Sequence, residues 1–247
     1  MTFSASSAVE QRTAWADVLT EHLPQVDALV TEDDTPVDNI FSEKQQRLLV
    51  ESLYNGWAGP GEGRPFLALA NVGLFYAVRQ PPLVPDVLVS LDVQVPADVW
   101  VKPNRSYLMW EYGKPPDVVI EIVSNQQRGE ERKLWDYAQL GIDYYVIFDP
   151  TEQLGAGALR VYGQHEGTYR PVATGTLSTV ELGVVLWQGV YEGLEQTWLR
   201  WCDAAGHLLP TGAERIEQEH QRAEQEHQRA ERLVAQLRAL GVEPQDG

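Results

Sequence analysis

The sequence predicts an α/β protein in which helices flank a mixed β-sheet, followed by a charged C-terminal helix. Two apolar runs with a helix-length segment between them, over 116–150, predict a strand–helix–strand unit with parallel strands. Short apolar runs separated by glycine turns, over 157–210, predict antiparallel strands that complete or flank the sheet. We therefore expect an N-terminal extension (1–40), one α/β domain (41–210) and a heptad-repeat helix (211–247).

The residues before the first strand predict two helices. The extension is expected to hold a short helix over about 10–22, then a loop through the acidic stretch TEDDTPVDN. Ser42 is the expected N-cap of a longer helix, and the pair Asn55-Gly56 is expected to end it. Between them, leucines recur at helical spacing: Leu48, Leu49 and Leu53.

Two apolar stretches follow the first long helix. The first stretch, 65–78, predicts one strand or a hairpin and reads PFLALANVGLFYAV. The second, 81–96, reads PPLVPDVLVSLDVQVP and predicts a strand. In this strand, valines and Leu91 alternate with Asp86, Ser90 and Asp92. After the irregular segment 97–115 we expect a strand from 116, a helix from about Arg128 to Leu140 and a strand over 143–150. Gly141 is the expected residue after the helix.

The segment 97–115 is rich in aromatic and basic residues. Arg105, Tyr107 and Trp110 could contact nucleic acid, since bases stack on aromatic side chains and phosphates attract cations. The same residues would also serve as a packed cover over the domain. The sequence alone leaves both interpretations open.

Charge limits the partners of this chain. Its 247 residues carry a net charge of −17. The tail 211–247 has eight acidic and five basic residues, a net −3, so about −14 remains for the body. Such acidity argues against a broad basic surface for nucleic acid, because phosphate binding depends on Lys and Arg. It suits a site for divalent cations and leaves room for a local basic groove.

The cysteine and histidine content and the hydropathy of the chain argue against a disulfide-bonded, a zinc-binding and a membrane-spanning protein. The one cysteine, Cys202, cannot form an internal disulfide or a cysteine-rich zinc site, and we expect it to be a small buried hydrophobic residue. The five histidines lack zinc-binding spacing. No apolar run is long enough to span a membrane, and the N-terminus does not resemble a signal peptide. We expect a cytoplasmic protein.

The tail contains an exact repeat, EQEHQRA, at 217–223 and 224–230. Seven residues is the coiled-coil period, and it yields a thin helical seam. The seam residues are Ala213, Ile216, His220, Ala223, His227, Ala230, Val234 and Leu237. The helix over 213–241 would either pair with a second copy or stand alone as a solvated helix stabilised by i,i+4 pairs such as Glu224 with Gln228.

Two carboxylates lie in the run PDVVIEIV. Asp117 and Glu121 are four residues apart, so in a strand they share one face. Asp117 follows a proline at the strand start, where aspartate often accepts backbone N–H bonds. Glu121 stands mid-strand, and a buried carboxylate is costly without a partner or a metal. A functional role is therefore favoured for Glu121.

A second strand supplies a matching acid. Asp86, in VPDVLV, repeats the Pro-Asp-Val context of Asp117, and neighbouring strands would bring Asp86 and Glu121 together. Two carboxylates with water make a hard oxygen site suited to Mg²⁺ or Mn²⁺. Lys133 lies in the helix after the Glu121 strand, where its ammonium would position or deprotonate an attacking water. Alone, it would be a solvated helix residue.

Three stretches together resemble the Uma2 family. They are PDVLV at 85–89, the strand–helix–strand unit at 116–150, and WLRWCDAAGHLLPTGAERIEQE at 198–219. The resemblance covers about 40–205. Uma2 proteins belong to the restriction-endonuclease-like PD-(D/E)xK superfamily, so the resemblance implies a mixed sheet flanked by helices and a Mg²⁺-dependent nuclease acting on DNA.

The resemblance also implies roles for single residues. Asp86 would be the superfamily's metal-binding aspartate, and Glu121 the metal-binding acid of the next strand. The superfamily lysine usually stands two residues after that acid, where this chain has Val123. In Uma2-like proteins the lysine moves to the following helix, which fits Lys133.

Two further acids fit the resemblance. Asp117 would be an auxiliary acid or a strand-start residue, and Glu51 on the first long helix would be an extra acid of the site. Mg²⁺, or Mn²⁺ in its place, would be the cofactor.

Three functions agree with these observations. The first is a metal-dependent endonuclease using Asp86, Glu121 and Lys133 on DNA. The second is a catalytically silent nuclease fold that serves as an interaction module and assembles through its C-terminal helix. The third is a metal-dependent phosphoesterase for a small nucleotide, which would need no DNA groove. The net negative charge of the chain favours the interaction module, and the set of two acids and a lysine favours the endonuclease.

Overall fold

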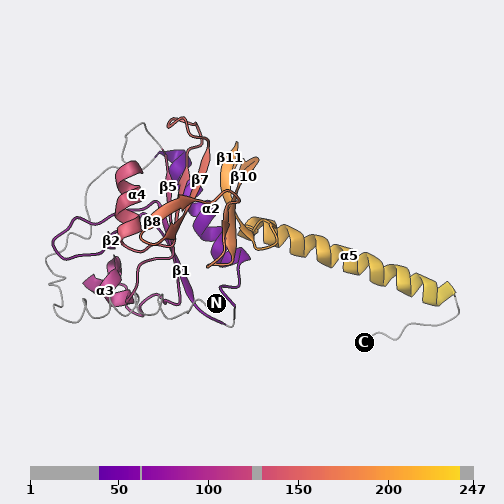
Figure 1. The fold of residues 1–247 in the computed structure, drawn as a ribbon. Coiled ribbons are helices and arrows are strands. Elements are labelled where there is room, and N and C mark those ends of the chain that lie inside the picture. Colours follow the sequence, from indigo (N-terminus) through magenta and orange to yellow (C-terminus); the bar gives the residue numbers. More distant parts are fainter. Residues whose placement is uncertain (1–38, 62, 124–129, 240–247) are drawn as a thin grey trace, which may run out of the picture.

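A six-stranded mixed sheet forms the centre of the computed structural model, which describes residues 39–61, 63–123 and 130–239 (Figure 1). The strand order is β1-β3-β5-β6-β7-β8, and only β5 and β6 run parallel. The short helix expected at 10–22 lies outside the described residues. The strands are β1 (Phe66–Ala70), β3 (Val87–Leu91), β5 (Val118–Ile122), β6 (Tyr144–Phe148), β7 (Leu159–His165) and β8 (Thr168–Pro171).

Two helices cover opposite faces of this sheet (Figure 1). Helix α2 (Ile40–Gly56) packs its leucines against the face formed by alternate strand residues such as Val87 and Ile120. Helix α4 (Glu130–Gln139) places Tyr137 against the other face, beside Val119. The expected parallel crossover is confirmed, since α4 joins the parallel strands β5 and β6. Gly141 follows this helix with a φ of 75°, as its C′ position requires.

The N-cap of α2 is Asn39, so the prediction of Ser42 was wrong. The Asn39 side chain accepts a 3.0 Å hydrogen bond from the Ser42 amide, which belongs to the first turn. Both residue types are good caps, and sequence propensity alone does not separate them. The helix ends at Gly56, as expected.

The stretch 65–78 is neither one strand nor a hairpin. Its first half, β1, pairs with β3, whereas β2 (Leu74–Phe75) pairs in parallel with β4 (Tyr107–Leu108) in a separate small sheet. The segment expected to be irregular contains β4, the 3-10 helix η2 (Lys102–Arg105) and the short helix α3 (Met109–Tyr112).

A second antiparallel sheet lies on the α2 side. It consists of β9 (Thr176–Leu177), β10 (Leu182–Tyr191) and β11 (Leu194–Asp203), in the order β11-β10-β9. Leu199 and Trp201 of β11 enter the core between α2 and the central sheet. These strands confirm the antiparallel pattern expected over 157–210. Cys202, at the end of β11, is a buried free thiol as expected, and burial raises its pKa.

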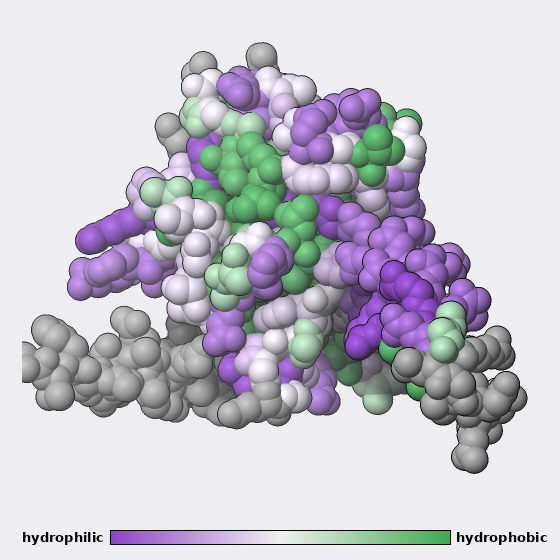
Figure 2. Space-filling model, turned by 90° about the vertical axis from the view of Figure 1, so that its right-hand side faces the viewer, coloured by the Kyte–Doolittle hydropathy of each residue, from purple (hydrophilic) through white to green (hydrophobic). Residues whose placement is uncertain are grey.

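Helix α5 (Gly212–Ala239) projects away from the domain (Figure 1). The face on its side of the molecule shows a hydrophobic area beside hydrophilic residues (Figure 2), and β10 exposes Leu186 and Val190. The seam residues Ile216 and Leu237 are 71% and 38% exposed. The helix is therefore confirmed, while its pairing in a coiled coil stays a prediction. Within the described residues, no helix is both long and apolar enough to cross a membrane.

Candidate active site

The register of β3 and β5 brings Asp86 and Glu121 together. Val87 pairs with Ile120 in an antiparallel ladder, so the next position along each strand sets Asp86 opposite Glu121. The Asp86 Oδ2 also accepts a hydrogen bond from the backbone N–H of Ile122. Both carboxylates are buried, with exposed fractions of 8% and 7%. The chain thus concentrates two negative charges at one end of this strand pair.

Helix α4 supplies two donors to Glu121. Lys133 Nζ donates to Oε2 over 2.7 Å, and the Tyr137 hydroxyl donates to Oε1 over 2.7 Å. The two donors are one helical turn apart, so they project from the same side of α4. Burial and the charge of Glu121 hold the pKa of Tyr137 well above its ordinary value. Tyr137 therefore remains a protonated donor at neutral pH, and the charge of Glu121 is compensated.

Helix α2 supplies the partner of Asp86. The Gln46 amide nitrogen donates to Asp86 Oδ1 over 2.9 Å, and its oxygen accepts from the Asn71 side chain over 2.9 Å. Asn71 adopts a φ of 52°, in the left-handed region, and its N–H donates to the Asp86 carbonyl. Sequence reasoning missed Gln46. The available signal was its place, three residues before Leu49 on the apolar face of α2, where a polar residue needs a partner.

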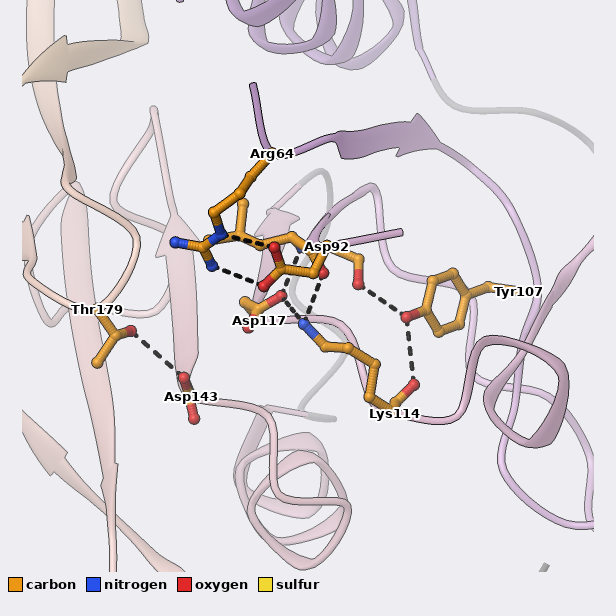
Figure 3. A network of polar contacts seen from close by, with 9 residues as sticks. Arg64, Asp92, Tyr107, Lys114, Asp117, Asp143 and Thr179 are labelled. Atoms are coloured by element: carbon orange, nitrogen blue, oxygen red, sulfur yellow. Dashed lines mark hydrogen bonds and ion pairs between the residues drawn. The ribbon is translucent and has the colours of Figure 1, made fainter. Parts of the chain in front are cut away.

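Asp117 lies at the opposite end of β5 from Glu121. Four residues of strand separate them by about 13 Å. Its carboxylate accepts from Lys114 Nζ and from the Leu91 N–H, at 2.5 and 2.7 Å (Figure 3). Asp117 thus fastens the end of β3 to the start of β5. This position matches the strand-start role and not the auxiliary-acid role.

Glu51 does not reach the site either. It lies five residues beyond Gln46 on α2, a separation of about 7.5 Å with a rotation of about 140° around the helix. Its carboxylate accepts hydrogen bonds from the Tyr191 hydroxyl and from the Gly212 N–H, both at 2.9 Å. The expected extra acid is therefore part of the attachment of α5.

The structure separates the three residues expected to contact nucleic acid. Tyr107 is fully buried, and its hydroxyl contacts Ser90 and the Lys114 carbonyl (Figure 3). It cannot stack on a base, so that expectation was wrong for Tyr107. Trp110 is half-buried, while Arg105 is exposed and donates to the Trp100 carbonyl. Within the segment 97–115, Trp100 is 79% exposed and is the accessible aromatic side chain that the sequence analysis did not single out.

The donor set at Asp86 and Glu121 fits a magnesium ion. The described residues hold no cluster of three or more acidic, histidine or cysteine side chains suited to a metal. Mg²⁺ usually keeps several waters and binds through one or two carboxylates plus substrate phosphate. A carboxylate oxygen has room for a second partner beside the hydrogen bond that it accepts. Two adjacent carboxylates at one end of the β3–β5 strand pair therefore meet this requirement.

A mixed sheet between helices, with an acid pair and a lysine at one strand end, is consistent with a restriction-endonuclease-like fold. The Uma2 family, described as "Putative restriction endonuclease", matches residues 32–190. The chain belongs to this family, which suggests a nuclease with DNA as its substrate. No curated protein matches the chain. Helix α5 lies beyond the matched residues.

Proposed function

We propose that this protein is a Mg²⁺-dependent endonuclease that hydrolyses DNA phosphodiester bonds with Asp86, Glu121 and Lys133. The observation that carries the proposal is the geometry around Glu121. This buried carboxylate faces a second one across a strand pair and is 2.7 Å from a lysine ammonium. Catalytic sites characteristically place charged groups in such partly buried clusters.

Asp86 and Glu121 would hold the metal ion. The ion would supply charge stabilisation to a phosphate and lower the pKa of water at the site. Gln46 orients the Asp86 carboxylate from one side of the sheet, and Tyr137 orients Glu121 from the other. Such hydrogen bonds fix the direction of the oxygens and so support metal affinity.

Lys133 provides the cation that the chemistry needs beside the metal. Its side chain is 40% exposed, so its ammonium meets both Glu121 and solvent. An ammonium at this boundary can orient the attacking water or accept its proton after losing one to solvent. It would also attract the negatively charged phosphate to an otherwise acidic protein.

Cleavage assays with purified protein test the proposal. Plasmid and single-stranded DNA would be incubated with Mg²⁺, Mn²⁺ or EDTA, using wild type, Glu121→Ala, Lys133→Ala and Arg132→Ala. Arg132 is the matched control because it adjoins Lys133 on α4 but has an 87% exposed side chain. We expect metal-dependent cleavage that is lost in the first two variants and kept in the third. Cleavage that survives Glu121→Ala would overturn the assignment.

A second function is favoured by a different observation. Helix α5 is 28 residues long, lies outside the family match and is exposed along most of its length. A silent nuclease fold that assembles through α5 would explain both this helix and the net charge of −17. Calorimetry separates the two functions: no Mn²⁺ binding by the wild type favours the module, and Mn²⁺ binding without DNA cleavage favours a small phosphate ester as substrate.

A further inference from the structure

Arg160 lies in the same row of the sheet as the two acids. Glu121 of β5 pairs with Ile147 of β6, and Ile147 pairs with Arg160 of β7. Paired residues of neighbouring strands point to the same face, so Arg160 shares the α4 face with Glu121. Val161, the next residue of β7, packs into the core on the α2 side, as this alternation requires.

The guanidinium of the half-buried Arg160 has two buried nitrogens that make no hydrogen bond within the part of the chain that the structure describes. Nε and Nη2 are shielded from solvent and have no partner among the described residues. A desolvated charged group normally has a hydrogen-bonded counterion, because burial otherwise costs several kcal/mol. Nε and Nη2 together form one edge of the guanidinium, which matches two oxygens of a phosphate. The missing partner is therefore an anion of that shape.

We infer that Arg160 binds a backbone phosphate of the DNA next to the phosphate that is cleaved. This inference rests on the proposed function. Two strand spacings separate the backbones of Arg160 and Glu121 by about 10 Å, so both can act on one DNA strand. The half-buried side chain can turn its Nε–Nη2 edge outwards by rotation about its own bonds. Arg160 is thus a substrate-positioning residue.

The position of Arg160 also bears on the acidity of the protein. A cation in a low-dielectric environment attracts an anion more strongly than one in water. A single half-buried arginine on the same face of the sheet as Glu121 can therefore provide the local attraction that the acidic surface lacks.

Salt-dependent DNA binding tests this inference. Fluorescence anisotropy of a labelled duplex in EDTA, where cleavage does not occur, would be measured from low to moderate salt. The variants are Arg160→Gln, Arg160→Lys and Arg170→Gln, the last being a matched control on the exposed part of β8. We expect Arg160→Gln to bind about tenfold more weakly, with a salt slope reduced by about 0.9, the value for one lost phosphate contact.

Arg160→Lys keeps the charge but not the planar edge, so we expect it to keep the slope and bind with intermediate affinity. If Arg160 had only a structural role, Arg160→Lys would not keep the salt slope of DNA binding while losing DNA affinity. Three outcomes would each overturn the inference. Arg160→Gln could bind DNA with the wild-type affinity and salt slope, Arg160→Gln and Arg170→Gln could lose equal DNA affinity, or the wild type could fail to bind DNA. Failure of the wild type to cleave DNA in Mg²⁺ would instead overturn the proposed function and leave the binding result to stand.

Discussion

At the scale of single residues, the site is a buried carboxylate whose partners come from a helix. Glu121 occupies a mid-strand position where burial of an unpaired charge costs free energy. Helix α4 donates two hydrogen bonds to it, one from the cation of Lys133 and one from the neutral hydroxyl of Tyr137. The neutral donor is the more informative of the two. A hydroxyl cannot neutralise the charge, so its role is to fix the direction of the carboxylate.

Removing this hydroxyl should affect both stability and metal binding. We expect Tyr137→Phe to lower the free energy of unfolding by about 1–3 kcal/mol, since a hydrogen bond to a buried charged group is lost. Mn²⁺ affinity should fall by about tenfold to a hundredfold. Urea denaturation and titration calorimetry measure the two effects.

Tyr169→Phe is the control for this prediction. The Tyr169 hydroxyl donates to the carbonyl of Ile142, a neutral group, over 2.9 Å. Its removal should cost about 0.5–1.5 kcal/mol and leave Mn²⁺ affinity unchanged. Wild-type Mn²⁺ affinity in Tyr137→Phe would show that the hydroxyl does not orient the acid.

Sequence reasoning found the two acids and the lysine of the site, but it missed Gln46, Tyr137 and Arg160. Asp86, Glu121 and Lys133 were predictable as a set because burial cost and strand alternation act on charges that can be read from the sequence. Gln46 carries no charge, so only its place on the apolar face of α2 separated it from a surface amide. Arg160 could not be placed, because its relation to Glu121 depends on the register of three strands.

At the scale of elements, the attachment of α5 explains the position of Glu51. Thr211 and Glu214 form a capping box, in which the Thr211 N–H donates to Glu214 and the Glu214 N–H donates to the Thr211 hydroxyl. Arg200, only 2% exposed, binds Glu214 through two nitrogens. Together with the bond from Gly212 to Glu51, these contacts fix the direction in which α5 leaves the domain.

Glu51→Gln distinguishes this attachment from a metal site. The amide keeps one acceptor, but its NH₂ group faces a donor, so we expect a loss of stability of about 1–3 kcal/mol. Mn²⁺ affinity should equal that of the wild type, because Glu51 does not lie at the acid pair. Weaker Mn²⁺ binding at wild-type stability would restore the auxiliary-acid role.

The capping box should make the stability of the chain depend on pH. Burial opposes the ionisation of Glu214, but hydrogen bonds from Arg200 and Thr211 prevail and hold its pKa below the ordinary value of 4.5. A carboxyl group whose pKa is lower in the folded protein than in the unfolded chain stabilises the fold at pH values above the unfolded-state pKa. This stabilisation is lost as the pH falls through the folded-state pKa.

We therefore compare the wild type with Glu214→Gln. The wild type should be more stable at pH 7, by at most about 1 kcal/mol because the side chain is 38% exposed. This difference should shrink below about pH 4.5. Urea unfolding from pH 7 to pH 3 measures it, and a difference that grows on acidification would contradict the sign.

Local patterns predicted the long elements well and the short ones poorly. The strand–helix–strand unit is set by periodicity and by Gly141, and the structure confirms it. The partner of β2 lies more than thirty residues along the chain, in β4. A two-residue strand owes its conformation to such a long-range contact, which no local window contains.

At the scale of the whole molecule, α5 gives an acidic domain a long exposed arm. Its seam is thin, because alanines and histidines bury little apolar area. If two copies pair through α5, charged histidines at His220 and His227 would face each other and repel.

We expect such a dimer at pH 8 to dissociate near pH 5–6. Analytical ultracentrifugation at several protein concentrations measures the mass at both pH values. Leu237→Lys places a charge in the seam and should give a monomer at pH 8. Equal mass at pH 5 and pH 8 would show that the histidines do not control assembly.

The reciprocal hydrogen bonds between β3 and β5 make strand register a condition for the proposed activity. The aspartate before each strand accepts the N–H near the end of the other: Asp86 from Ile122, and Asp117 from Leu91. A slip of one residue would break both bonds and turn Glu121 to the α2 face, away from Lys133. If the proposed function holds, a chain that folds in the wrong register would therefore be inert, and a misfolded copy would pose no threat to the DNA around it.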